Sequence, residues 1–426
     1  MPQFSLRLVI ILLGIILLVF TSIIGCSKSS AEKPSPTTSV TQTETPPPTP
    51  PEKVITIGNM TDFTGVSATA MEYINMSLDD MVKYYNDNNL IPGVRFKVES
   101  YDGQMDPARD IPGYEWLIEN GADFIFSPIP ATPTTLKTRV ENDEVVLFAM
   151  AASREAYLPP GYVFNLGIDS KSEGYTMMKW IAENDWDYET KGPAKVGGAA
   201  WSESHSDKVL EAMEEYCDAH PDQFEWVGGY LTHFSMNWQA EVEALKDCDY
   251  IYPGIVFITF VKQFHEAGHT KAKFIGSDTQ AAFFDMVDAA ELWDEIDGML
   301  FVKFSRWWNE DGEIVDLVKQ LLHQNHPDQA ETVIRAGVGY MAGNQIYAMF
   351  QILADAAEAV GAQNLDSQAI YDAATSFSLS TDGVCRLSFG EEKRDAVDAY
   401  GIYEARAVEE DIFRAQDAWF PTVRNL

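Results

Sequence analysis

The residues His265 to His269 spell His-Glu-Ala-Gly-His, a pattern that can bind a metal ion. Two histidines four positions apart on one helix face can bind zinc, and the glutamate beside the first can act as a general base. Glu291 follows further along the chain and could supply a third ligand. The chemistry that this pattern would support is zinc-dependent hydrolysis.

The sequence around the pattern argues against a zinc site. Both histidines must lie on one continuous helix, yet Gly268 is the residue type that commonly ends a helix. The next predicted strand begins soon afterwards, at residues 271–275. We therefore expect His269 to leave the helix face, and we expect no metal, no cofactor and no enzymatic activity. Zinc hydrolysis stays as a remote alternative.

Acidic residues dominate the composition. The chain has 65 Asp and Glu against 30 Lys and Arg, which gives a formal net charge of -35 at pH 7. Nucleic acids and anionic lipid surfaces attract basic proteins. The composition therefore argues against a nucleic-acid partner and against electrostatic adhesion to a membrane surface.

The cysteines are too few and too scattered for a cysteine zinc site. They are Cys26, Cys217, Cys248 and Cys385, with no Cys-x-x-Cys pair among them. An exported protein can form disulfides. Cys217 and Cys248 are the nearest pair along the chain, and the sequence leaves open whether they form a bridge.

Residues 1–25 have the pattern of an export signal. Arg7 is the only charged side chain among them, and residues 8–20 are all apolar or Gly. A positive start followed by an apolar run of about 7–15 residues is typical of a secretory signal. Residues 23–26, Ile-Ile-Gly-Cys, resemble the lipobox of bacterial lipoproteins, in which the chain is cut before a cysteine that receives lipid. We expect Cys26 to be lipidated.

The alternative to a lipoprotein signal is a single anchoring helix over residues 8–25. Both interpretations put the remaining chain outside the cytoplasm, at the cell surface or in the periplasm. Residues 26–53 are rich in Pro, Ser and Thr and lack apolar periodicity, so they cannot bury enough surface to offset their ordering entropy. Extended at about 3.1 Å per residue, this tether reaches roughly 80 Å at most.

The rest of the chain alternates apolar runs with helical patterns, first over residues 54–149 and again over residues 162–276. Strands linked in this way by helices form parallel sheets covered by helices. A further strand at residues 299–304, a long helix at 344–360 and a hairpin of residues 384–389 with 399–405 complete the prediction. We expect an α/β fold with two doubly wound lobes that bind ligand at the carboxyl ends of their strands.

An ordered set of segments resembles the solute-binding proteins of branched-chain amino-acid (Leu/Ile/Val) ABC importers, the type I periplasmic binding proteins. The similarity runs from about residue 54 to residue 403. Its carriers are ITIGNMTDFTG (55–65), YDGQMDP (101–107), the GADFIFSP, VVLFAMAAS and YVFNLGIDS segments within 121–170, AKVGGAAWSES (194–204), KFIGSD (273–278) and DGMLFVKF (297–304).

The resemblance implies a Venus-flytrap architecture in which the chain crosses three times between two lobes. We place these crossings near residues 166–170, 300–304 and 387–403. The expected N-terminal lobe then comprises residues 54–167 plus 303–386, and the expected C-terminal lobe comprises residues 168–302 plus 387–426.

The resemblance also implies ligand-binding residues in the first lobe. In the family, the segments matching residues 129–132 and 151–153 clamp the ligand. The residues implied here are Pro130, Ala131, Thr132, Ala151, Ala152 and Ser153. The hydroxyls of Thr132 and Ser153 could donate to a ligand or cap a helix. Pro130 stands where hydroxyl residues are common and has neither hydroxyl nor N–H, which weakens the case for an α-amino acid.

From the second lobe, Asp278 matches the acidic residue that typically holds a ligand ammonium group, although Asp is also a common turn residue. His205 falls where an aromatic residue often closes over the ligand. Trp201, Phe257 and Tyr340 could wall the pocket or could fill the core.

The resemblance implies a small polar solute, either an amino acid or a related amide or carboxylate, with an aromatic acid also open. Its partners would be the permease and ATPase subunits of an ABC importer. We expect a monomer held to the membrane through its lipid. A ligand-binding sensor with the same fold is the alternative, and neighbouring permease and ATPase genes would favour import.

Overall fold

The computed structural model describes residues 51–381 and 384–426 of the 426-residue chain. The predicted signal peptide, Cys26 and nearly all of the predicted tether lie outside the described residues. The described residues belong to one compact unit. Within the described ranges, no helix is both long and apolar enough to cross a bilayer.

The first sheet has five parallel strands in the order β2-β1-β3-β4-β5. The strands are β1 Lys53–Thr61, β2 Val94–Asp102, β3 Phe124–Ser127, β4 Leu147–Ala152 and β5 Val163–Asp169. The helices between them are α1 Ala68–Asp87, the 3-10 turn η1 Pro107–Arg109, α2 Asp110–Glu119, α3 Thr132–Asp143 and α4 Arg154–Tyr157. The predicted alternation of strand and helix is confirmed here, with each strand end within a few residues of its expected place.

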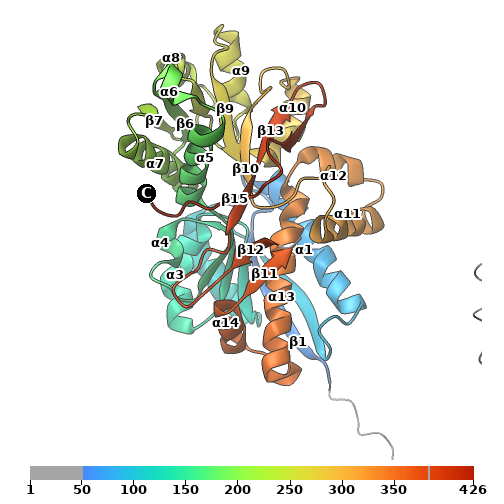
Figure 1. The fold of residues 1–426 in the computed structure, drawn as a ribbon. Coiled ribbons are helices and arrows are strands. Elements are labelled where there is room, and N and C mark those ends of the chain that lie inside the picture. The colour runs from blue at the N-terminus through green and yellow to red at the C-terminus, as the bar shows by residue number, and fades with distance from the viewer. Residues whose placement is uncertain (1–50, 382–383) are drawn as a thin grey trace, which may run out of the picture. The chain divides into compact units, whose positions relative to one another are not determined.

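The second sheet runs β14-β13-β10-β9-β8-β6-β7, and β15 pairs with β13. Its parallel strands are β6 Ala194–Trp201, β7 Phe224–Thr232, β8 Tyr250–Tyr252, β9 Lys273–Ser277 and β10 Leu300–Lys303, while β13 Ala399–Arg406, β14 Asp411–Arg414 and β15 Phe420–Pro421 are antiparallel. Its helices are α5 Ser170–Asn184, α6 Tyr188–Lys191, α7 Ser204–Ala219, α8 Gln239–Leu245, α9 Ile258–Glu266, η2 Gln280–Phe283 and α10 Phe284–Ala290. Helices flank both sheets (Figure 1), which confirms the predicted α/β fold class.

Between β10 and β13 the chain is mostly helical. The elements are α11 Glu313–Asn325, α12 Ala330–Ala336, η3 Gly339–Ala342, α13 Gly343–Val360, η4 Ala362–Asn364, α14 Ser367–Thr375, β11 Ser378–Thr381 and β12 Val384–Ser388. Helix α13, predicted at residues 344–360, packs against α1 and α14. The chain thus returns to the first lobe after β10 and reaches the second sheet again at β13.

The predicted hairpin of residues 384–389 with 399–405 is wrong. β12 pairs with β11, and β13 pairs with β10 and β14. Both apolar runs are strands, but each pairs with other strands. Just before β13, an antiparallel bridge joins Leu387 to Val397, and the N–H groups of Ser388 and Asp398 donate to the carbonyls of Ala396 and Arg386, each at 2.8 Å. Strand β8 ends at Tyr252, because Pro253 and Gly254, which has a φ of +73°, follow it directly and cannot continue its ladder.

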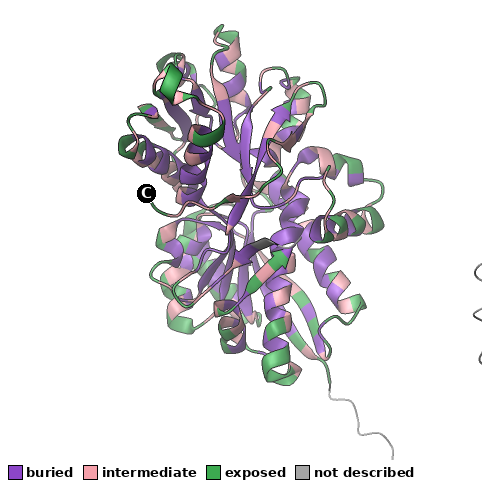
Figure 2. Ribbon diagram, viewed as in Figure 1, coloured by how far each residue is buried: buried purple, intermediate pink, exposed green. Residues whose placement is uncertain are grey.

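The strands of both sheets form the core (Figure 2). In the first sheet, the rings of Phe124, Phe148 and Phe164 are fully buried and follow one another across β3, β4 and β5, with centroids 5.7 and 6.0 Å apart. In a parallel sheet that is covered on both faces, the sequence of each strand is a nearly continuous apolar run. That is why these strands could be recognised in the sequence.

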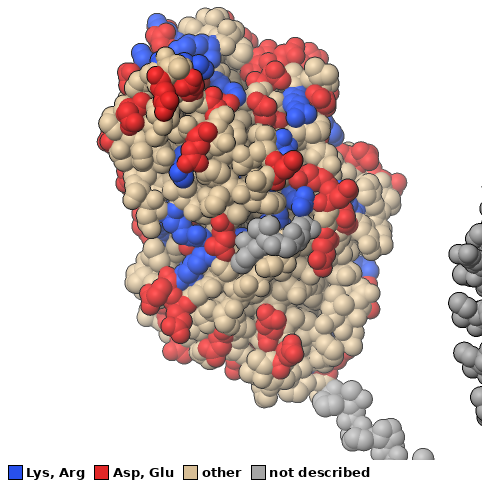
Figure 3. All heavy atoms as spheres, in the orientation of Figure 1, with Lys and Arg blue, Asp and Glu red and all other residues tan. Residues whose placement is uncertain are grey.

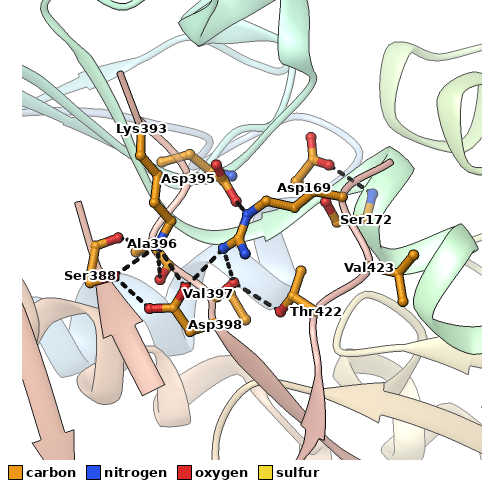
Figure 4. A network of polar contacts seen from close by, with 12 residues as sticks. Asp169, Ser172, Ser388, Lys393, Asp395, Ala396, Val397, Asp398, Thr422 and Val423 are labelled. Atoms are coloured by element: carbon orange, nitrogen blue, oxygen red, sulfur yellow. Dashed lines mark hydrogen bonds and ion pairs between the residues drawn. The ribbon is translucent and has the colours of Figure 1, made fainter. Parts of the chain in front are cut away.

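The C-terminal segment ties the crossing region together (Figure 4). Arg424 Nε lies 2.7 Å from Asp395 Oδ2, and Arg424 Nη2 lies 3.1 Å from Asp398 Oδ1. The N–H of Val423 donates to Thr176 Oγ1 of α5 at 2.9 Å. The C-terminus therefore joins the start of the second lobe to the strand-like stretch that leads into β13.

That stretch also contacts the first sheet. Asn165 of β5 forms a β-bridge with Asp395, and its N–H donates to the Arg394 carbonyl at 2.8 Å. Lys393 Nζ lies 2.7 Å from Asp398 Oδ1. Asp169, which ends β5, accepts the Ser172 N–H at 2.7 Å and so caps α5. Polar contacts thus concentrate where the chain passes from one sheet to the other.

Many charged side chains of the chain lie on its surface. On the face in Figure 3, acidic and basic side chains are interspersed. Exposed ion pairs such as Lys179 with Glu183 join some of them, and such pairs contribute at most about 1 kcal/mol each.

Candidate functional site

Loops at the carboxyl ends of both sheets meet around one cavity of about 150 Å³, which we call the inner cavity. Its walls come from the loops after β2, β3, β8, β9 and β10, from strands β4 and β5, from α1 and η2, and from the chain around the start of α13. Most of the lining is apolar. The large apolar residues in it are Met71, Ile74, Met105, Ile129, Met150, Ile168, Ile255, Phe283, Phe304 and Val338.

Asp62 fixes the loop that brings the start of α1 to the inner cavity. Its fully buried carboxylate accepts hydrogen bonds from the N–H of Thr64 at 3.1 Å and from the N–H and hydroxyl of Ser67 at 3.0 and 2.8 Å. These bonds satisfy backbone donors that the helix start would otherwise leave open. Ser67 therefore lines the cavity with its hydroxyl already engaged.

On the opposite side, Gln280 ties together the loops after β8 and β9. Its Oε1 accepts from the Ser277 N–H and from Thr279 Oγ1, both at 2.8 Å, and its Nε2 donates to the Gly254 carbonyl at 2.8 Å. Gln280 is fully buried. It thereby positions Thr279 and the neighbouring loop residues of the second lobe against the cavity.

Asp278 lines the inner cavity, as expected, but its carboxylate is already paired. Lys303 Nζ bonds to Asp278 Oδ1, and the Phe304 N–H donates to Oδ2 at 3.3 Å. Lys303 is fully buried at the end of β10 and also lies 4.7 Å from the centroid of the Trp307 ring. Burial raises the pKa of the Asp278 carboxyl, and the Lys303 ammonium opposes that rise. The charge expected to hold a ligand ammonium is thus neutralised within the protein.

Some of the predicted first-lobe residues line the inner cavity, and others lie in the elements that form its walls. Pro130 and Ala151 line the inner cavity. Ala131 precedes α3 as its N-cap, and Ala152 is fully buried in β4.

The two predicted hydroxyls bond within the first lobe. Thr132 Oγ1 donates to Asp110 Oδ1 at 3.1 Å, and burial raises the pKa of Asp110 to about 6. Ser153 Oγ lies 3.4 Å from Thr134 Oγ1. Both side chains hold α3 to its neighbours instead of facing the inner cavity.

His205 lies inside the second lobe, with only 1% of its surface exposed. Its Nδ1 lies 2.8 Å from Ser170 Oγ, and its Nε2 lies 3.4 Å from Glu173 Oε2. Burial lowers the pKa of His205, but the carboxylates of Glu173, Glu203 and Asp169 outweigh it and leave the pKa above its ordinary value. His205 therefore joins the first turns of α5 and α7.

The three predicted aromatic residues lie in different places. Trp201 lines a second cavity next to the inner one, and its Nε1 donates to the Ser235 carbonyl at 2.9 Å. Phe257 is fully buried beside α9. Tyr340 is buried and donates its hydroxyl to Asp80 of α1. The latter two rings fill the core.

Sequence reasoning missed several cavity residues, among them Met71, Met105, Phe283 and Gln345. It also missed Lys303. One signal was available for Lys303, because a lone cation interrupts the otherwise apolar run Leu-Phe-Val-Lys-Phe of residues 300–304. A charge at the end of a buried strand needs a partner, and Asp278 supplies it.

The His-Glu-Ala-Gly-His pattern does not lie on one helix. Helix α9 ends at Glu266, and Gly268 has a φ of +85°, as the sequence predicted for a helix stop. Within residues 51–381 and 384–426, no group of three or more His, Cys, Asp and Glu could hold a metal ion. Cys217 and Cys248 are separate buried thiols, and burial raises the pKa of each to about 12.

We predict that His205 makes stability depend on pH. A histidine whose pKa is raised in the folded state adds stability that is complete below its unfolded pKa of about 6.5 and is lost as pH rises through the folded value. The difference in Tm between the wild type and His205→Gln should therefore be larger at about pH 5.5 than at about pH 9. His233, which is exposed, provides the control variant His233→Gln. A Tm difference for His205→Gln that does not change with pH would contradict this role.

We also predict that Lys303→Met destabilises the protein by about 3–5 kcal/mol, because it leaves the Asp278 carboxylate buried without a partner. The double variant Lys303→Met with Asp278→Asn should recover most of that loss. Urea denaturation measures the free energy of unfolding. Lys179→Met, which breaks an exposed ion pair, should cost less than about 1 kcal/mol, and equal costs for the two single lysine variants would refute the prediction.

The fold is shared with solved structures of low sequence identity. A branched-chain amino acid ABC transporter protein from Thermus thermophilus with bound valine is 17% identical, with a TM-score of 0.75, over 87% of this chain and 97% of that chain. An ABC transporter solute-binding protein from Rhodopseudomonas palustris BisB5, in complex with 3,4-dihydroxybenzoic acid, is 16% identical, with a TM-score of 0.69, over 88% and 99%. A fatty acid ABC transporter substrate-binding protein from Thermomonospora curvata is 15% identical, with a TM-score of 0.70, over 86% and 92%.

No curated protein matches the chain. The family model described as periplasmic binding protein matches residues 54–410, which include both sheets up to β13 and every residue that lines the inner cavity. Proteins of this family bind solutes for ABC transporters without catalysing a reaction, and the family implies an extracytoplasmic location. The chain belongs to the periplasmic binding protein family.

Proposed function

We propose that the protein is the solute-binding lipoprotein of an ABC importer and that it captures a small organic solute in the inner cavity. The observation that carries the proposal is the make-up of that cavity. Met71 and Ala151 reach it from the first lobe, and Ile255 and Phe283 reach it from the second. A solute bound there touches both lobes at once.

Such a solute favours the closed arrangement of the lobes, because it gains contacts with both lobes only when they are closed. We propose lobes of residues 54–167 plus 303–386 and 168–302 plus 387–426, which open and close about the three crossings. The polar network around Arg424 lies at one crossing and Lys303 lies at another. The closed form would then present one face of each lobe to the permease.

The solute class follows from the lining. We expected a small polar solute, either an amino acid or a related amide or carboxylate. The pairing of Asp278 with Lys303 removes the partner for an ammonium group, and Pro130 adds no donor. We therefore favour a carboxylate, an aromatic acid or an amide over a free amino acid. The similar structures named above include complexes or transporters of an amino acid, an aromatic acid and fatty acid.

The N-terminus fits a membrane-anchored protein outside the cytoplasm. Residues 1–25 would be removed as a signal peptide, Cys26 would carry lipid, and residues 26–53 would form a tether. The tether would let a monomeric binding body reorient near the permease. The family supports the extracytoplasmic location, while the anchor rests on the lipobox sequence alone.

The first test of the function is ligand-induced stabilisation and compaction. In a thermal-shift panel of carboxylates, aromatic acids, amides and amino acids, at least one solute should raise the Tm, because a ligand at 100 times its Kd stabilises by about 2.7 kcal/mol. Small-angle X-ray scattering should then show a smaller radius of gyration with that solute.

Variants at the cavity separate specific binding from general effects. Met105→Trp fills part of the inner cavity and should abolish the Tm shift, whereas Val408→Trp, at a fully exposed position, should retain it. If no solute of any class changes either the Tm or the radius of gyration, the proposed function is wrong.

The second test concerns the anchor. Cys26→Ser should remove the lipid attachment site and move the protein from the membrane fraction to the soluble fraction of expressing bacterial cells. Incorporation of labelled palmitate should be lost at the same time. Cys217→Ser, which changes a buried thiol of the folded body, is the matched control and should keep both. Unchanged membrane association and labelling in Cys26→Ser would rule out lipidation at this residue.

A further inference from the structure

A second cavity adjoins the inner one. It has a volume of about 490 Å³ and is also lined from both lobes, by Val66 and Tyr73 near α1 and by Trp201, Phe234, Met236 and Met286 from the second lobe. We call it the outer cavity. Val66, Phe234, Met236 and Met286 expose 72%, 43%, 51% and 38% of their surfaces. Apolar side chains gathered and exposed in this way commonly mark a binding surface.

The two cavities share walls. Ser67, Ala70, Ala282 and Phe283 line both of them. Ala70 belongs to α1, and Ala282 and Phe283 belong to η2. The junction between the cavities is therefore formed by the start of α1 and by η2, and most of the side chains on either side of it are apolar. The shared residues place the inner cavity directly beside the exposed apolar residues of the outer one.

The polar side chains that line the inner cavity are already engaged. Ser67 Oγ donates to Asp62 at 2.8 Å, and Thr279 Oγ1 donates to Gln280 at 2.8 Å. Gln345 Nε2 donates to the Met150 carbonyl at 3.4 Å. Asp278 is held by Lys303 and by the Phe304 N–H. Burying a charged ammonium group beside these side chains would cost free energy that no new ion pair returns.

We propose that the ligand is an elongated, mainly apolar molecule without an ammonium group, and that its hydrocarbon chain passes the Ala282 junction to occupy both cavities. This inference rests on the proposed function and specifies its solute class. A molecule the size of valine would fill the inner cavity alone and would leave the apolar walls of the outer cavity exposed. A longer chain covers both sets of apolar walls, so its affinity grows with the area that it buries.

Calorimetric titration with straight-chain carboxylates tests the length of the site. From butyrate to octanoate, the dissociation constant should fall about fourfold with each added CH₂ group, the change expected for burying that group. Octanamide should bind with a dissociation constant similar to that of octanoate, because the proposal concerns the hydrocarbon chain of the ligand and not a charged head group. A dissociation constant that does not change with chain length would overturn the proposal.

A matched pair of probes tests the missing ammonium partner. Octanoate and 2-aminooctanoate differ only in the ammonium group, and the amino acid should bind at least about tenfold more weakly, because its charge finds no buried partner. Equal or tighter binding of 2-aminooctanoate would overturn the proposal.

Two tryptophan variants test the junction. Ala282→Trp should block the passage, so that octanoate loses at least about tenfold in affinity while butyrate binds as it does to the wild type. Ala289→Trp makes the same change at an exposed position of α10, away from both cavities, and should alter neither ligand. Unchanged octanoate binding in Ala282→Trp would show that the chain does not pass this point. If Ala282→Trp bound neither octanoate nor butyrate but kept the Tm of the wild type, the result would also contradict the proposal that the ligand occupies two separate cavities.

The outcomes distinguish this inference from the proposed function. If short amino acids or other compact solutes raise the Tm and compact the protein while the long-chain probes do not, the protein binds a solute but the elongated ligand is refuted. If no solute of any kind binds, the proposed function fails and the ligand class falls with it.

Discussion

The ion pair between Asp278 and Lys303 sets the character of the candidate site. Asp278 directly follows β9 and Lys303 is the last residue of β10, the adjacent parallel strand, and neither residue is appreciably exposed. A buried pair of this kind gains little net stability over apolar residues, but losing one partner is costly. It therefore constrains the chain at the point where β10 leaves the second sheet. It also removes from the cavity the one acidic charge among the described residues that line it.

Polar and apolar contacts are separated in this fold. The crossing region is rich in charges, with Arg424, Asp395 and Asp398 linking the C-terminus to the stretch before β13. Most of the large apolar side chains that line the inner cavity are methionine, isoleucine or phenylalanine. Directional ion pairs hold the crossing chains in register, whereas apolar walls can adapt, and methionine adapts most readily of the three. The proposed opening and closing of the lobes would use both properties, in these two places.

Much of the fold could be read from the sequence, because a covered parallel sheet requires continuous apolar runs such as Phe124–Ser127. Strand pairing was harder, and the predicted hairpin failed because β12 pairs with the preceding strand β11, whereas β13 joins β10 and β14 in the second sheet. Site positions transferred only in part. Pro130, Ala151 and Asp278 line the inner cavity, but the side chains of Thr132 and Ser153 bond within the lobe. Hydroxyl direction and the Lys303 pairing depend on tertiary contacts that spacing does not encode.

A largely apolar site has a particular kind of selectivity. One CH₂ group changes affinity in an apolar pocket by about fourfold, whereas a missing hydrogen bond to a polar site can change selectivity far more strongly. Because Ser67, Thr279 and Asp278 are bound within the protein, discrimination here must come mainly from shape and length. The Ala282 junction between the cavities is where shape would act. Such a site would bind a series of related hydrocarbon-chain ligands instead of one solute. Its preferred ligand length would change with the size of a few side chains on η2 and α1.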